Sequence, residues 1–155
     1  MVVALGEELK VTPVKPSAIL AGVRIENLSH LELVFLVKKG FALEALNEML
    51  NVSELYSSKK ILTRIMGKSI RTLKRHVLQR GPLLLNEYQS AVALQYALVL
   101  EHASLAFGNQ RLAENWLKKP CNQFEGEIPL ELIDNFWGYR LITDYLERVI
   151  SGVYQ

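Results

Sequence analysis

A long apolar run near the middle of the chain, from Asn86 to Phe107, constrains the fold more than any other feature. It consists mainly of Ala, Leu, Gln and Tyr, and this composition favours an α-helix. Asn86 can cap its start, and Gly108-Asn109 can end it. Apolar side chains occupy more than one side of this helix. We therefore expect it at the centre of a domain, or shared with a second subunit.

This apolar run is not expected to cross a membrane, because polar residues interrupt it from Gln89 to His102. Met1 to Leu9 carry neither a basic region nor an apolar stretch ending in small residues, so no signal peptide is expected. The single cysteine, Cys121, excludes a disulfide framework and fits a reducing compartment. Together these features predict a cytoplasmic protein.

Further helices are expected on both sides of the central one. No segment alternates polar and apolar residues convincingly, so the predicted fold class is all-α. Residues 1–28 contain Pro13 and Pro16 and show no sustained period, which predicts a flexible amino-terminal arm. In the last helix, Leu141, Ile142, Tyr145, Leu146 and Val149 are expected to face the core. The other predicted helices run from Ser29 to Gly40, Phe41 to Leu50, Ser57 or Ser58 to Met66, Ser69 to Arg80, Gln110 to Leu117 and Gly138 to Ile150.

Charge is unevenly distributed along the chain, although the net charge is only +2. The segment from Lys59 to Arg80 has eight basic residues and no acidic residue, which leaves ten basic against 16 acidic residues elsewhere. Such a block is typical of a surface that binds a polyanion. A solvated helix face would look the same, so charge alone leaves both interpretations open.

The basic block also has the pattern of a helix-turn-helix. Two short amphipathic segments are joined by Gly67-Lys68-Ser69, and the second is strongly basic. Ile65, Ile70 and Leu73 are expected to pack the two helices together. The amino-terminal part of the second helix would then meet base edges and phosphates. The predicted DNA-contacting residues are Lys68, Ser69, Arg71, Thr72, Lys74 and Arg75.

The sequence does not indicate an enzyme. His30, His76 and His102 are far apart and lack a metal-ligand spacing, and no histidine is identified as a base for Cys121. The nine glycines are dispersed, so no phosphate-binding loop is expected. We predict no catalytic residue, metal or cofactor. Aromatic residues concentrate in the last third, where most are expected to complete a core and some to serve an interface: Trp116, Phe124, Phe136, Trp137 and Tyr139.

A recognisable order of residues runs through the last third of the chain: Phe107-Gly108, Ala113, Trp116-Leu117, Pro120, Pro129-Leu130, Gly138, Leu146, Arg148, Ile150 and Gly152. This order resembles the toxin-binding domain of the Xre/MbcA/ParS antitoxin family. The residues from Gly67 to Arg75 resemble the Xre-like helix-turn-helix of the same family, and the resemblance covers about Leu31 to Tyr154. Two stretches depart from the family pattern: the acidic loop from Cys121 to Glu127, and Phe136-Trp137.

The resemblance implies an antitoxin of a type II toxin–antitoxin operon. Its partner would be a RES-domain toxin that depletes NAD, and the antitoxin would also bind operator DNA and repress its own operon. Together with the composition of the amino terminus, the resemblance predicts three regions: a flexible arm (1–28), a DNA-binding and dimerisation region (29–106) and a toxin-binding domain (107–155). The expected toxin contacts are Arg140, Arg148, Ser151, Gly152, Val153 and Tyr154.

Two alternatives to the antitoxin remain open at this point. One is a free-standing transcriptional regulator whose carboxy-terminal domain senses something else, and the other is a helical adaptor that binds no DNA. A homodimer is expected for the antitoxin and for the transcriptional regulator, because a helix-turn-helix commonly reads two half-sites about one helical turn apart.

Overall fold

The computed structural model describes residues 14–152 and confirms the all-α prediction. Within these residues, backbone pairing between extended segments is limited to an isolated antiparallel bridge between Ala42 and Leu84. The helices are α1 (Pro16–Ala21), η1 (Ile25–Asn27), α2 (His30–Lys39), α3 (Leu43–Asn51), α4 (Lys59–Met66), α5 (Ile70–Arg80), α6 (Glu87–Phe107), α7 (Gln110–Leu117), η2 (Asn122–Phe124), η3 (Pro129–Glu131) and α8 (Phe136–Ile150).

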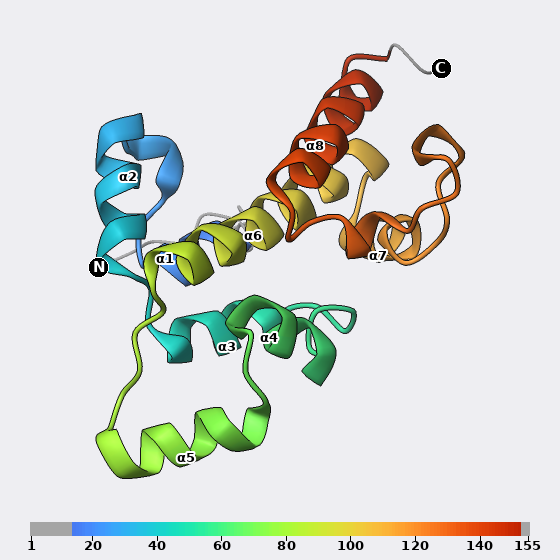
Figure 1. The fold of residues 1–155 in the computed structure, drawn as a ribbon. Coiled ribbons are helices and arrows are strands. Elements are labelled where there is room, and N and C mark those ends of the chain that lie inside the picture. Colours follow the sequence, from blue (N-terminus) through green and yellow to red (C-terminus); the bar gives the residue numbers. More distant parts are fainter. Residues whose placement is uncertain (1–13, 153–155) are drawn as a thin grey trace, which may run out of the picture.

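Helix α6 is the centre of the molecule (Figure 1), and α1, α2, α4, α7 and α8 all pack against it. Ten of its 21 residues are buried, including Tyr96, Val99 and Ala103 with no exposed surface. Among the described residues, α6 is also the one helix long and apolar enough to cross a membrane, but half of its most apolar window is buried inside the structure. Other helices of the same chain therefore cover both of its apolar sides.

Side-chain caps at the helix starts explain why the sequence predicted most boundaries closely. Ser29 and Asn86 each form a reciprocal capping box, with Glu32 and Gln89 respectively. Helix α8 begins at Phe136, two residues before the predicted start. The reason is Asn135, whose side-chain oxygen accepts hydrogen bonds from the backbone N–H groups of Trp137 and Gly138.

The predicted flexible arm is wrong for residues 14–28, while residues 1–13 lie outside the described part of the chain. Residues 14–28 form α1 and η1, and α1 packs against α3 and α6. Leu20 is buried in the core, and the backbone N–H of Ser17 donates to Glu101 Oε1 at 2.7 Å. A helix this short is stabilised by such distant contacts, which local sequence periodicity does not reveal.

The core-facing side of α8 differs by one position from the predicted side. Ile142 and Leu146 are fully buried as predicted, but Leu141 is 48% exposed. Thr143 is buried instead, because its hydroxyl donates to the backbone carbonyls of Tyr139 and Arg140. This internal hydrogen bonding allows a polar side chain to occupy a core position.

Gly138 allows the first turn of α8 to lie against the segment that follows η3. A Cβ at this position would collide with the backbone carbonyl and the Cβ of Leu132. Backbone atoms cannot move away as a flexible side chain would, so the close approach requires glycine.

We therefore predict that Gly138→Ala lowers stability. Helix propensity alone would favour alanine by about 1 kcal/mol, whereas overpacking against a fixed backbone costs about 1–3 kcal/mol. Thermal unfolding followed by circular dichroism measures the net effect, with Arg140→Ala on the exposed side of α8 as the control. An unchanged or higher Tm for Gly138→Ala would contradict the close packing.

Candidate functional site

The first candidate surface is formed by α4, α5 and the turn between them. Gly67 ends α4 in a left-handed conformation (φ 66°), and its N–H donates to the carbonyl of Thr63. Ser69 then caps α5, because its Oγ accepts from the backbone N–H of Thr72 at 3.2 Å and lies 2.9 Å from the Thr72 hydroxyl. Both helices and the three-residue turn lie where the sequence predicted them. The Ser69 hydroxyl is engaged in this cap.

The structure divides the basic block into two groups. Lys60 lies 3.5 Å from Glu131, and Arg64 is close enough to Tyr96 to influence its phenol. Burial raises the pKa of Tyr96 to about 12, with the nearby Asp134 adding to the rise and Arg64 opposing it. Lys59 and Lys60, at the start of α4, are both exposed. The second group is also exposed and lies on or beside α5, which has no acidic residue: Lys68, Arg71, Lys74, Arg75 and Arg80.

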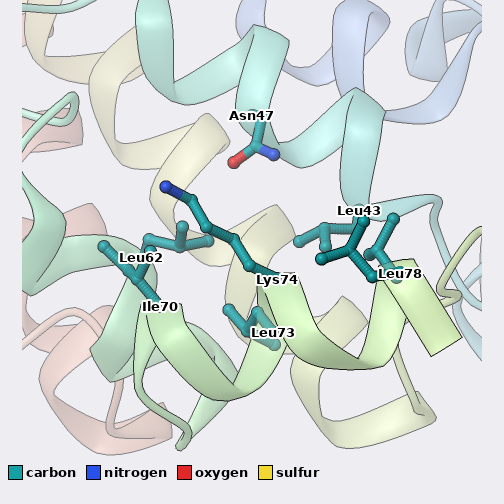
Figure 2. Close-up of a pocket in the computed structure, with 8 residues that line it drawn as sticks. Leu43, Asn47, Leu62, Ile70, Leu73, Lys74 and Leu78 are labelled. Atoms are coloured by element: carbon teal, nitrogen blue, oxygen red, sulfur yellow. The ribbon is translucent and has the colours of Figure 1, made fainter.

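Helix α5 is loosely attached to the rest of the molecule, with Leu73 as its one buried residue. An apolar groove of about 490 Å³ lies between α5 and helices α3 and α4 (Figure 2). Ile70, Leu73 and Val77 line its α5 side, as the predicted apolar stripe requires. Lys74 also lines the groove and extends toward Asn47 of α3 (Figure 2). Arg71 and Arg75 do not line this groove.

Backbone hydrogen bonds hold the far end of α5 in place. After the helix ends, the carbonyl of Leu83 accepts from Leu43 N–H at 2.9 Å, and Leu85 N–H donates to the carbonyl of Phe41 at 2.8 Å. Phe41 therefore belongs to this bridge and not to the helix predicted from Phe41 to Leu50. The turn at one end and the bridge at the other restrain the two ends of α5.

The second candidate surface belongs to the carboxy-terminal helices. Its interior is an aromatic cluster in which Trp116 stacks on Tyr145, with ring centroids 5.5 Å apart and planes within 3°. Phe124 meets both rings edge-on, and Phe107 contacts Trp116. The predicted core role is thus confirmed for Trp116 and Phe124. Cys121 is also buried.

Phe136 and Trp137 are not core residues. They are 55% and 76% exposed, and their rings lie 5.3 Å apart in an edge-to-face arrangement. Leu141 lies on the exposed side one turn after Trp137, and Arg140 beside it forms a long ion pair with Asp144 at 3.9 Å. We call Phe136, Trp137, Arg140 and Leu141 the α8 patch. Large aromatic side chains predict burial, so hydrophobicity alone could not reveal this exposed surface.

The remaining predicted contacts lie further along α8. Arg148 is exposed two turns beyond Arg140. Ser151 closes the helix, since its Oγ and its N–H both bond to the carbonyl of Glu147. Gly152 follows in a left-handed conformation (φ 75°). Val153 and Tyr154 lie outside the described residues.

Within residues 14–152, no group of three or more His, Cys, Asp or Glu side chains has the geometry of a metal site. His76 and His102 each direct Nδ1 into the interior without a hydrogen-bond partner in the described part of the chain. The described surfaces thus include a basic helix, α5, and an exposed aromatic patch on α8.

Comparison with known proteins bears on the second surface. Residues 102–152 match the model of the antitoxin Xre/MbcA/ParS C-terminal toxin-binding domain. This part of the chain is therefore similar to the toxin-binding domain of Xre/MbcA/ParS antitoxins. An 83-residue stretch is also 28% identical to Antitoxin Xre of Pseudomonas putida and covers 54% of this chain. That stretch spans about half the length of the relative.

The matched residues comprise the end of α6 together with α7, η2, η3 and α8. The resemblance expected from the sequence is thereby confirmed for its toxin-binding part. The matched range contains the aromatic cluster, Gly138 and the whole α8 patch. This domain match makes α8 the first place to examine for a protein partner.

Proposed function

We propose that this protein is the antitoxin of a type II toxin–antitoxin system and neutralises its toxin through α8 and the chain that follows. The observation that carries the proposal is the coincidence of two findings. Residues 102–152 match the model of the toxin-binding domain, and the exposed aromatic pair Phe136 and Trp137 lies within that range. Its action is binding, which requires no catalytic group in the antitoxin.

The α8 patch has the chemistry of an interaction hot spot. Trp, Tyr and Arg are the residues most enriched where protein interfaces gain their affinity. Trp137 stands beside Phe136 on a helix whose other side is fully buried through Ile142 and Leu146. A rigid helix loses little conformational entropy when it binds, so the patch is suited to tight association.

We further propose that the partner is a RES-domain toxin that depletes NAD, as the family resemblance implies. In this proposal, Arg140 and Arg148 contact the toxin, together with the segment from Ser151 to Tyr154. An arginine offers five donors in a fixed geometry, which suits a pocket built to accept phosphate and ribose groups.

The protein is also proposed to repress its own operon as a cytoplasmic homodimer. The exposed cations of α5 support this, because no acidic residue lies on that helix to neutralise them. Arg71 and Arg75 are the proposed base-contacting residues, with Lys68, Ser69, Thr72 and Lys74 nearby. Lys68 and the Ser69 N–H lie at the start of α5, which favours a phosphate contact.

We expect Arg71→Ala and Arg75→Ala to weaken binding to the promoter of the operon. An arginine that contacts a guanine edge is typically worth about 1–3 kcal/mol of discrimination. Fluorescence anisotropy with labelled promoter DNA over a range of salt concentrations measures the loss. Lys60→Ala is the matched control, because it removes the same charge from a side chain that faces Glu131. Equal affinity for all three variants and the wild type would refute DNA reading by α5.

Trp137→Ala is expected to reduce toxin affinity by about 2 kcal/mol or more, as for an aromatic hot spot. The side chain is 76% exposed, so folding should be unaffected. Isothermal titration with the purified toxin measures affinity, and circular dichroism checks the fold. Tyr88→Ala, at a site 71% exposed on α6 and outside residues 102–152, is the control for loss of an exposed aromatic side chain. Wild-type toxin affinity in Trp137→Ala would remove the α8 patch from the interface.

Truncation after Val149 tests the end of the chain separately. It removes Ile150, which is 43% exposed, and everything after it. We expect promoter binding to persist while rescue of growth against co-expressed toxin is lost. Full rescue by the truncated protein would locate the inhibitory surface elsewhere, with the acidic loop from Glu125 to Glu131 as the next segment to test.

A further inference from the structure

The groove between α5 and helices α3 and α4 leaves about 490 Å³ unfilled (Figure 2). This volume falls within the range typical of small-molecule sites, about 300–1,000 Å³. Its walls are mainly aliphatic, so an apolar ligand that displaces water from the groove would bind favourably. The six aliphatic lining residues are Leu43, Leu62, Ile70, Leu73, Val77 and Leu78.

The groove has a formed floor and an open side. Leu43 and Leu73 are only 8% and 4% exposed, because both pack into the core. Val77 and Leu78, on α5, are 40% and 87% exposed. A ligand would therefore lie on a surface that exists without it, and it would cover apolar side chains that the chain itself leaves in water.

Two polar side chains meet across the groove and indicate the chemistry of the ligand. Lys74 extends from α5 toward Asn47 of α3 (Figure 2). No acidic residue lines the groove, and none of the ion pairs within residues 14–152 involves Lys74. An ammonium group beside apolar walls attracts an anion more strongly than a fully hydrated one does, and the Asn47 amide can donate to the same anion.

We propose that this groove binds a small amphipathic carboxylate, of the class of medium-chain fatty acids. The alkyl chain lies against the leucine side chains, and the carboxylate is held by the Lys74 ammonium and the Asn47 amide. One cation and one amide suit a single negative charge. A phosphate group would call for further cations, and neither Arg71 nor Arg75 lines the groove.

The ligand would contact α3, α4 and α5 at once. Helix α5 has one buried residue of its own, so a bound alkyl chain would add to the contacts that hold it. In the proposed repressor, Lys74 also lies near the DNA, and a carboxylate paired with it removes one positive charge from that surface. We therefore expect the ligand to weaken promoter binding. This regulatory consequence rests on the proposed function, whereas the ligand site does not.

Isothermal titration of the full chain with decanoate, below its micelle-forming concentration, tests the site directly. We expect a Kd of about 0.1–1 mM, and octanoate should bind about fourfold more weakly for each methylene lost. Acetate supplies the charge without the chain, and decyltrimethylammonium supplies the chain without the negative charge. Both should bind at least about tenfold more weakly than decanoate. Equal affinity for decanoate and decyltrimethylammonium would refute recognition of a carboxylate.

Two variants test the named contacts. Lys74→Met keeps an apolar stem without the charge, and decanoate affinity should fall about tenfold; Lys60→Met, outside the groove on α4, is the matched control. Val77→Trp should fill the groove and abolish binding with an unchanged circular dichroism spectrum, because this site is already 40% exposed. Leu105→Trp, at a site 69% exposed on α6, is its control. Wild-type decanoate affinity in Lys74→Met or in Val77→Trp would overturn the proposal.

Amide hydrogen exchange locates the ligand on the chain. Exchange should slow along α5 and α3 when decanoate is added, and should stay unchanged in α8. Slowing confined to α8 would move the ligand to the α8 patch and refute the groove site. Sedimentation tests for a protein occupant. If Val77→Trp reduced self-association of the chain while Leu105→Trp did not, the groove would belong to a second copy and the proposal would fail.

The regulatory consequence has a separate readout. Promoter affinity should fall several-fold in saturating decanoate and stay constant in acetate of equal concentration, which controls for ionic strength. Decanoate binding in a protein that never binds the promoter would refute the repressor function and leave the groove site standing. Promoter binding in a protein that does not bind decanoate would refute the groove site alone.

Discussion

Burial of α6 is the requirement on which the rest of the structure depends. A 21-residue helix with apolar side chains on opposing sides cannot be covered by a single neighbour, and five other helices pack around it. Segments far apart in the sequence, such as α1 and α8, therefore meet on one helix. The amino-terminal and carboxy-terminal regions consequently share one core, although they carry separate candidate surfaces.

The polar residues of α6 contribute to this arrangement. The side chain of Gln89 donates to the carbonyl of Met66, the last residue of α4, and Gln95 donates to the carbonyl of Ile133. Carbonyls at a helix end lack partners within the helix, and a buried one left unpaired is costly. The glutamines that interrupt the apolar run thus donate hydrogen bonds to backbone carbonyls of neighbouring segments, and they connect α6 to both candidate surfaces.

The sequence predicted features that depend on local chemistry. Capping residues such as Ser29 and Asn86, and glycines such as Gly67, gave helix boundaries to within a few residues, because their effects act over one turn. Features that depend on distant contacts were missed. The arm assignment failed at α1, whose stability comes from α3 and α6. The core assignment failed at Leu141 for a local reason: a hydrogen bond within α8 allows Thr143 to be buried, and hydrophobicity alone does not reveal it.

The two candidate surfaces differ in how firmly their helices are held, which bears on how each would bind. Helix α8 is fixed by Ile142 and Leu146 and by the glycine contact at Gly138, so Trp137 is displayed by a rigid element. Helix α5 has one buried side chain and is restrained at its ends, by the turn at Gly67 and by the backbone bridge at Leu83. A rigid surface needs little ordering on association, whereas a loosely packed helix must be immobilised by its ligand, which reduces net affinity. Phosphate contacts from several cations can offset that cost, because their strength accumulates along the helix. The charges differ in the same way: Lys60 and Arg64 of α4 face acidic or phenolic groups of their own chain, whereas α5 carries exposed cations and no acidic residue.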